Sequence, residues 1–254
     1  GQSTVDIILN TPDSFDVYAI TAYKNVELLA KNAIDLNAKC AVIGDEALLD
    51  DLSNALNGTD IKALAGQDAI EQCAAHKVDI VMAAIMGFAG LKPILKALDQ
   101  GVNVAIANKE PLVAAGDLIM STAAQTGAKI LPVDSEHNAI FQVFENHNRE
   151  CIDKIIITAS GGPFLEWSVA EKALATPEQA VKHPNWSMGK KISVDTASMM
   201  NKALEVSAAH YLFDLPPEKI DVLIHPQSVI HSMVSYIYGP VFSQMGSSDM
   251  RTQR

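Results

Sequence analysis

Two hydrophobic periods alternate along the first 135 residues, and this alternation limits the fold more than any other feature of the sequence. Residues 78–85 (VDIVMAAI) are almost entirely apolar, as expected of a strand that is buried on both faces. Strands that alternate with helices predict βαβ units, a parallel sheet and therefore an α/β fold. The predicted strands are 15–22, 38–44, 78–85, 103–108 and 129–133, and the predicted helices are 3–10, 26–36, 45–56, 87–100 and 111–125.

The pattern changes near Ile152, where we predict that a second, α+β domain begins. Residues 152–158 read as a strand that leads into Ser160-Gly161-Gly162-Pro163. Residues 166–191 are polar and contain prolines, which predicts a loop. Beyond them we predict a helix at 204–213 and strands at 222–225 and 232–244. The predicted domains are therefore 1–150 and 151–254.

Composition excludes several classes of function. The net charge of −11 leaves no general basic surface, so we expect no nucleic-acid partner. No apolar run reaches the roughly 18 residues that a membrane-spanning helix needs, and no signal peptide is visible, so we expect no membrane partner. The three cysteines, Cys40, Cys73 and Cys151, lie far apart without a CxxC motif, which suits a reduced cytosolic protein.

Asp134-Ser135-Glu136 follows directly after a predicted strand. Ligands of open α/β sheets bind beyond the carboxyl ends of the strands. Two carboxylates one residue apart can converge on a hard cation such as Mg²⁺ or Mn²⁺, and Glu205 is a candidate third ligand. The alternative is a solvated acidic helix start, because Asp and Ser are common caps and Glu favours the first turn.

Two further segments carry groups that suit an anionic substrate. Ser160, Thr196, Asn201 and Lys202 can donate hydrogen bonds to phosphate, although a turn followed by an ordinary helix start explains the same residues. Residues 183–189 (HPNWSMG) suit a lid over a small substrate, or else a surface loop whose Trp186 packs inward.

The remaining polar candidates are less specific. Lys109 follows a predicted strand, so it is either catalytic or a cation at a helix start. His225 and His231 lack metal-site spacing, so structural roles, or one histidine near a ligand, are favoured over metal binding. The chain contains no GxSxG motif, which disfavours covalent hydrolase chemistry.

Six segments together resemble the 1-deoxy-D-xylulose 5-phosphate reductoisomerase family. They occur in the family's order and spacing, and the resemblance extends over essentially the whole chain. Several long motifs in register are far more specific than any one of them, and they favour the functional interpretations above. The segments are AIANKE (105–110), LPVDSEHNAIFQ (131–142), SGGPF (160–164), HPNWSMGKKISVD (183–195), MMNKALE (199–205) and LIHPQSVIHSM (223–233).

The resemblance implies an NADPH-binding, Rossmann-like parallel-sheet domain over residues 1–150 and an α+β catalytic domain over 151–254 that binds metal and substrate. The implied metal ligands, for Mg²⁺ or Mn²⁺ with Co²⁺ also possible, are Asp134, Glu136 and Glu205. The implied catalytic residues are these three with Lys109, His183, Trp186 and His231. The implied substrate contacts are Ser135, Glu136, Ser160, His183, Trp186, Met188, Thr196, Asn201, Lys202 and Glu205.

The resemblance also implies a set of residues at or beside NADPH. Lys24 and Asn25 would face the 2′-phosphate that distinguishes NADPH from NADH. Tyr23 stands where the family often has glycine, and Thr196 stands where many members have serine. The implied cofactor-binding residues are Gly1, Thr21, Lys24, Asn25, Ala84, Ile85, Gly87, Ala107, Asn108, Lys109, Glu110, Gly189 and Met250.

The implied reaction converts 1-deoxy-D-xylulose 5-phosphate to 2-C-methyl-D-erythritol 4-phosphate, by isomerisation followed by hydride transfer, in the non-mevalonate isoprenoid pathway. A homodimer in the bacterial cytoplasm or a plastid is expected. The chain is expected to lack the family's first strand and glycine fingerprint, of which Gly1 would be the last glycine, and its C-terminal domain. The alternatives are an inactive fragment of this enzyme and a metal-independent NAD(P)-dependent oxidoreductase with a similar two-domain plan.

Overall fold

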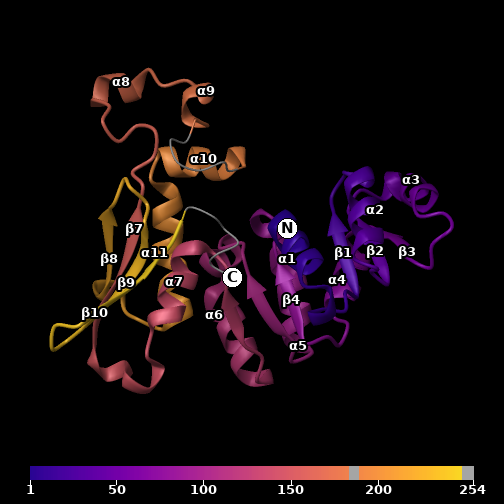
Figure 1. Ribbon diagram of the computed structural model, residues 1–254, viewed down its shortest axis with the longest axis horizontal. Helices are drawn as coiled ribbons and strands as arrows, with labels where there is room; N and C mark the ends of the chain where they lie inside the picture. Colours follow the sequence, from indigo (N-terminus) through magenta and orange to yellow (C-terminus); the bar gives the residue numbers. More distant parts are fainter. Residues whose placement is uncertain (183–188, 248–254) are drawn as a thin grey trace. The chain divides into compact units, whose positions relative to one another are not determined.

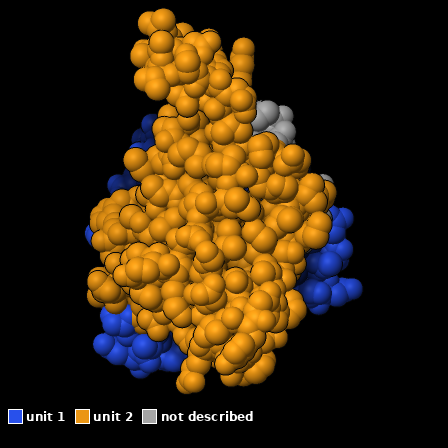
Figure 2. Space-filling view, turned by 90° about the vertical axis from the view of Figure 1, so that its left-hand side faces the viewer, with its two compact units in different colours: residues 1–85, 89–105, 121–129 blue, residues 86–88, 106–120, 130–254 orange. Residues whose placement is uncertain are grey.

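The computed structural model describes residues 1–182 and 189–247. The chain divides into two compact units, coloured separately in Figure 2. Unit 1 comprises residues 1–85, 89–105 and 121–129, and unit 2 comprises residues 86–88, 106–120 and 130–254. None of the described helices is both long and apolar enough to cross a membrane. Together the elements form a mixed α/β fold, as the alternating periods predicted.

Unit 1 contains a three-stranded parallel sheet of order β1-β2-β3 (Figure 1). Its strands are β1 (Ala19–Ala22), β2 (Cys40–Ile43) and β3 (Lys62–Ala65). Apolar side chains of α2 and α3, such as Leu29 and Leu52, pack with Ile43 of β2 in a buried cluster. Asn25 starts α2, because its side chain accepts a hydrogen bond from Leu28 N. The helices are α1 (Gln2–Asn10), α2 (Val26–Asp35), α3 (Leu49–Ala55) and α4 (Gln67–Ala74).

A second three-stranded sheet has the order β4-β5-β6, with strands β4 (Ile80–Ala83), β5 (Asn103–Ile106) and β6 (Ile130–Pro132). The prediction that β4 is buried on both faces is wrong, because Ile80 is 45% exposed. β4 is an edge strand of its sheet, so only β5 supports it. The accompanying helices are α5 (Leu91–Asp99) and α6 (Glu110–Thr126), and α6 is kinked at Ala115.

Unit 2 is built on a four-stranded sheet of order β10-β9-β7-β8. β7 (Ile152–Ala159) pairs parallel with β8 (Ile220–Ile224) and antiparallel with β9 (Ile230–Tyr236), which pairs antiparallel with β10 (Val241–Met245). Helices α7 (Ser135–Val143) and α11 (Met200–Phe213) lie beside this sheet (Figure 1), and they share one apolar core with it. Ile140, Ile155 and Phe213 are among its buried residues.

Three local predictions in the second half differ from the structure. The strand predicted at 232–244 is a hairpin, because the chain turns at Gly239, whose φ is 97°. The loop predicted at 166–191 contains α8 (Val169–Ala173), α9 (Pro177–Ala180) and the start of α10 (Lys190–Ala197). Capping boxes at Ser168 and Thr176 stabilise the two short helices. The helix predicted from 204 begins earlier, at Met200.

Candidate active site

Three carboxylates from two helices meet in unit 2. Asp134 follows β6 at the N-cap of α7, Glu136 lies in the first turn of α7, and Glu205 lies on α11. One carboxylate oxygen from each lies within 4.8 Å of the others. Asp134 makes no capping hydrogen bond to α7, so the alternative of an ordinary acidic helix cap does not account for its side chain. Glu205 is completely buried, where a carboxylate needs partners.

Two lysines supply those partners. Lys109 Nζ lies 2.6 Å from Asp134 Oδ2 and 2.8 Å from Glu205 Oε1. Lys202 Nζ lies 3.1 Å from Glu136 Oε1, donates to Thr158 O at 2.6 Å, and also donates to Glu205 Oε2. Ion pairs with Lys109 and Lys202 therefore join α7 to α11, and the hydrogen bond to Thr158 O joins α11 to β7. The cluster sets three carboxylates against two ammonium groups.

The mutual arrangement shifts the pKa values of the cluster. Burial lowers the pKa of Lys109, but the carboxylates of Asp134 and Glu205 together raise it by more than burial lowers it, so the net shift is upward. The pKa of Lys202 is raised for the same reason, with burial opposed by Glu136 and Glu205. Burial acts to raise the pKa of Asp134, yet the Lys109 ammonium holds it well below its usual value. Both lysines are therefore cations at neutral pH.

Glu205 is the residue on which most of these contacts converge. Burial, followed by the nearby Glu136 carboxylate, raises the pKa of Glu205, while Lys109 and Lys202 act to lower it. Asn201 also contacts this carboxylate, because its Nδ2 donates to Glu205 Oε1 at 2.5 Å. The carboxylate therefore accepts hydrogen bonds from three side chains.

His137 is a member of the cluster that the sequence interpretation missed. Its side chain is 1% exposed, and Nε2 lies 2.8 Å from the backbone oxygen of Glu205. Since a carbonyl oxygen only accepts, Nε2 carries the proton. Nδ1 lies 3.5 Å from Asp134 Oδ1. One imidazole thus connects the helices that carry the acidic residues. The only sequence signal for this role was that His137 directly follows Glu136.

The predicted phosphate-binding residues lie on neighbouring parts of unit 2. Ser160 follows β7, and its Oγ accepts a hydrogen bond from Gly162 N at 3.3 Å. A Cβ at Gly162 would lie 2.7 Å from Thr196 O, so the glycine loop packs closely against the end of α10. Asn201 and Lys202 stand in the first turn of α11, directly after α10. The Thr196 hydroxyl donates to Ile192 O at 2.8 Å.

Other predicted residues have definite local roles. Ser135 Oγ donates to Glu136 Oε2. His231 lies on β9 with 3% exposure, and Thr158 Oγ1 donates to its backbone oxygen at 2.8 Å. His225 Nε2 accepts from Val229 N and Ile230 N, both at 3.2 Å, which is a structural role in the turn before β9. His183, Trp186, Met188 and Met250 lie outside the described residues.

The predicted cofactor-binding residues are divided between the units. In unit 2, Asn108 Nδ2 donates to Gly87 O at 2.8 Å, Ala107 precedes Asn108, Glu110 pairs with Lys191, and Gly189 is the N-cap of α10. In unit 1, Lys24 lies 3.5 Å from Asp45, and Asn25 caps α2. Thr21 lies on β1, Ala84 and Ile85 follow β4, and Gly1 precedes α1. Their assignment to NADPH stays a prediction.

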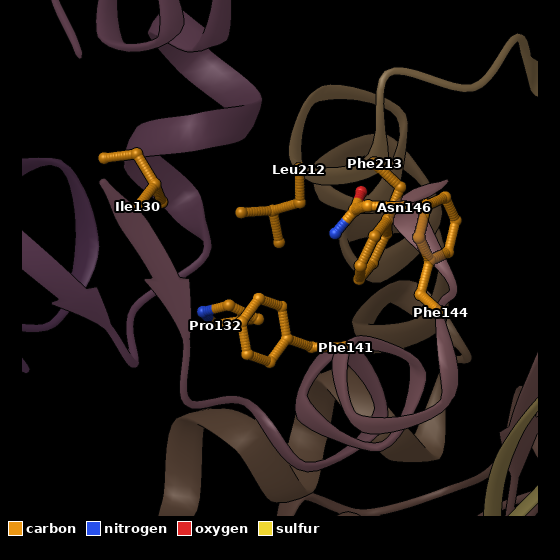
Figure 3. Close-up of a pocket in the computed structure, with 7 residues that line it drawn as sticks. All are labelled: Ile130, Pro132, Phe141, Phe144, Asn146, Leu212 and Phe213. Carbon is orange, nitrogen blue, oxygen red and sulfur yellow. The ribbon is translucent and has the colours of Figure 1, made fainter. Parts of the chain in front are cut away.

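Two hollows in unit 2 are separate from the acidic cluster. Figure 3 shows the smaller one, of about 70 Å³, between β6, α7 and the end of α11. The other, of about 350 Å³, lies beside α11 and includes His210 and Tyr211. No lysine or carboxylate of the cluster lines either hollow. The smaller hollow is lined by Ile130, Pro132, Phe141, Phe144, Asn146, Leu212 and Phe213.

Comparison with known proteins gives a consistent result. Residues 1–116 match the model of 1-deoxy-D-xylulose 5-phosphate reductoisomerase, and residues 130–213 match that of its C-terminal domain. The reductoisomerase of Zymomonas mobilis is 55% identical over 252 residues, which are 99% of this chain and 65% of that protein. A Bradyrhizobium relative of the same name is 53% identical over 99% of this chain and 62% of its own length.

Solved structures agree with the sequence relatives. The Zymomonas mobilis reductoisomerase in complex with NADPH superposes with a TM-score of 0.93 at 52% identity, covering 100% of this chain and 65% of that one. A DOX-P reductoisomerase in complex with NADPH, fosmidomycin and magnesium superposes at 0.95 with 41% identity and the same coverage. The chain thus spans less than two thirds of its relatives' length, and its fold is that of their Rossmann-like α/β enzymes. The chain belongs to the 1-deoxy-D-xylulose 5-phosphate reductoisomerase family.

Proposed function

We propose that the protein containing this chain converts 1-deoxy-D-xylulose 5-phosphate to 2-C-methyl-D-erythritol 4-phosphate with NADPH and a divalent metal ion, as a step of isoprenoid biosynthesis. The supporting observation is the convergence of Asp134, Glu136 and Glu205, whose ligand oxygens lie within 4.8 Å of one another. Family membership and the NADPH and magnesium complexes of the relatives support the same assignment. Residues 1–150 form the proposed NADPH domain and residues 151–254 the proposed catalytic domain.

The acidic cluster fits a hard divalent cation. All three candidate ligands are carboxylates, which Mg²⁺ and Mn²⁺ prefer. Asp134 Oδ1 is buried and, within the described part of the chain, accepts no hydrogen bond, so it is available to a ligand. Asp134, Glu136 and Glu205 would hold Mg²⁺ or Mn²⁺, with Co²⁺ as a further candidate. When bound, the ion would polarise the substrate's ketone and hydroxyl oxygens, and NADPH would supply the hydride.

The chain's own residues would orient the substrate and control charge. Ser160, Thr196, Asn201 and Lys202 would bind the phosphate, which is remote from the reacting carbons and anchors them. Lys109 would act as a cation and hydrogen-bond donor, because the surrounding carboxylates raise its pKa and keep it protonated. Ser135, His183, Trp186, Met188 and His231 are the remaining proposed substrate-side residues.

The first experiment measures NADPH oxidation by absorbance with 1-deoxy-D-xylulose 5-phosphate, with and without Mn²⁺. It compares this chain with a longer chain that carries the further segments of its relatives. Oxidation that requires Mn²⁺ is the expected result for the longer chain. Activity in the longer chain alone would identify the present chain as an inactive fragment, whereas oxidation without metal would favour the metal-independent oxidoreductase.

A single substitution tests the metal ligands in the active longer chain. Glu205→Gln removes one anionic ligand, so metal-dependent turnover should fall at least about a hundredfold while NADPH binding is retained. Asp221→Asn is the control, because Asp221 pairs with Lys154 on the sheet and should leave turnover unchanged. Unchanged turnover of Glu205→Gln at saturating Mn²⁺ would remove Glu205 from the ligand set.

We also propose a homodimer in the bacterial cytoplasm or a plastid. Exposed apolar side chains on the edge strand β8, including Val222, Leu223 and Ile224, support association with another polypeptide. All three cysteines are free, which suits a reducing compartment. Sedimentation equilibrium of the longer chain tests the dimer, and a monomeric mass at micromolar concentration would contradict it.

A further inference from the structure

The hydrogen-bond donors of Lys202 are fully used in this structure. A lysine ammonium has three N–H groups. Those of Lys202 are directed to Glu136 Oε1, Thr158 O and Glu205 Oε2. A phosphate oxygen therefore finds no donor on Lys202 unless one of these acceptors is given up. Glu136 and Glu205 are both proposed metal ligands, so the acceptors in question belong to the metal site.

Asn201 is engaged in the same way. Its Nδ2 donates to Glu205 Oε1 at 2.5 Å, and the same oxygen accepts from Lys109 Nζ at 2.8 Å. Two of the four proposed phosphate-binding residues are thus directed to one carboxylate. The Thr196 hydroxyl is also directed away, to Ile192 O. The donor groups needed for an anion are present, but in this arrangement they serve Glu205 and the α10 backbone.

The first turn of α11 is otherwise suited to an anion. Asn201 and Lys202 are its second and third residues, and α11 is 14 residues long, so its N-terminus carries positive partial charge. Ser160 and the close-packed glycine loop approach from the end of β7. The Glu205 carboxylate lies one turn further along α11, and it accepts hydrogen bonds from both Asn201 and Lys202.

We propose that Glu205 couples the two proposed sites: binding of a divalent cation to its carboxylate releases Asn201 and Lys202 to bind the substrate phosphate. This inference rests on the proposed function. It adds that binding of the divalent cation increases the affinity for the substrate phosphate. A cation that binds the Glu205 oxygens replaces the positive charge that Lys202 supplies. The ion pair between Lys202 and Glu205 is therefore weakened, and the ammonium group can turn to another acceptor. Coupling of binding free energies is reciprocal, so phosphate should equally strengthen cation binding.

Calorimetric titration of inorganic phosphate into the metal-free chain, in EDTA, tests the release without requiring turnover. Glu205→Gln keeps the size of the side chain and removes the charge that holds Asn201 and Lys202. We expect it to bind phosphate about tenfold more tightly than the unaltered chain, the effect of freeing about one charge-assisted hydrogen bond. A loss of affinity, or no change, would overturn the proposal.

Asp134→Asn is the matched control. It removes the same charge from the same cluster, but Asp134 pairs with Lys109 rather than with Asn201 or Lys202. We expect its phosphate affinity to rise less than about threefold, the part due to net charge alone. If both variants gained phosphate affinity equally, removal of one negative charge would explain the increase, and the proposed coupling through Glu205 would be overturned. Circular dichroism and thermal unfolding establish that each variant is folded.

A second measurement covers the case in which Glu205→Gln does not fold. Phosphate affinity of the unaltered chain is measured with and without Mn²⁺, and compared with Asn201→Ala. The factor by which Mn²⁺ increases phosphate affinity should be at least about threefold smaller in Asn201→Ala, because one of the released hydrogen-bond donors is missing. An identical gain would mean that the ion itself binds the anion, against the proposal. Because no turnover is measured, absence of reductoisomerase activity would not affect either result.

Discussion

Among single residues, Cys40 illustrates how burial controls chemistry away from the acidic cluster. Its side chain is 3% exposed on β2, and its Sγ lies 3.7 Å from that of Cys73 on α4. Burial, together with Cys73, raises the pKa of the Cys40 thiol to about 12. Only the thiolate is nucleophilic, so Cys40 should react more slowly with iodoacetamide at pH 8 than Cys73 and Cys151, which are both partly exposed. Peptide mapping by mass spectrometry measures the three rates, and equal rates would contradict this prediction.

The same shift gives a pH dependence of stability with a definite sign. The neutral thiol is favoured in the folded state, so its contribution is fully present below the ordinary thiol pKa of 9.0. It is lost as the pH rises from there toward about 12. In Cys40→Ala this part of the alkaline decline should be absent, which urea unfolding at pH 8 and pH 10.5 would detect.

Residues of the candidate site were predictable to different degrees. Asp134 and Glu136 could be selected because they follow a strand end, and Glu205 was a candidate third ligand that the resemblance then favoured. The ion pairs of Lys109 with Glu205 and of Lys202 with Glu136 join residues 96 and 66 positions apart. Local periodicity contains no information about such contacts, because they depend on how helices pack on a sheet. His137 escaped notice for the same reason, since its partner is a backbone oxygen on another helix.

Among the elements, the errors of prediction have local causes. The capping boxes Ser168–Glu171 and Thr176–Gln179 were readable in the sequence, but polar composition and prolines favoured a loop. Gly239 likewise marked the turn between β9 and β10. β3 was not predicted, because Lys62–Ala65 is short and only partly buried. Helices with a clear apolar face, such as α2 and α5, were predicted close to their observed bounds.

Tyr236 makes the connection between β9 and the end of α7 testable. The side chain is buried, and its hydroxyl donates a hydrogen bond to Val143 O at 3.2 Å. The hydroxyl oxygen of Tyr236 also accepts a hydrogen bond from Glu145 N at 3.1 Å. Tyr236→Phe leaves both backbone groups without this partner, which should lower the free energy of unfolding by about 1–3 kcal/mol. Tyr238→Phe is the control, because Tyr238 is 90% exposed on the same hairpin. Urea denaturation measures the free energy of unfolding of both variants. Equal values would show that the Tyr236 hydroxyl does not stabilise the fold.

For the whole molecule, fold class was the most predictable property. Parallel strands require crossover connections, so alternating strand and helix periods restrict the chain to the α/β class without any knowledge of contacts. The composition of the acidic cluster depends instead on tertiary structure, since side chains of α7 and α11, Lys109 before α6 and a backbone oxygen of β7 all contribute to it. Stability of the molecule and occupancy of this cluster should therefore be linked.

This linkage gives a prediction for metal addition and removal. An ion that binds only the folded chain at a hundred times its Kd raises the free energy of unfolding by about 2.7 kcal/mol. We expect an increase of this size when MnCl2 is added, and its complete reversal by EDTA. Because Glu136 contributes one of the three converging carboxylates, Glu136→Gln should lose most of the increment. Asp221→Asn, which alters an exposed carboxylate paired with Lys154, should keep it. Urea unfolding with Mn²⁺ and with EDTA measures all three chains. If Glu136→Gln gained as much stability from Mn²⁺ as the unaltered chain, the ion would be acting at another place, and Asp134, Glu136 and Glu205 would be joined only by their lysines.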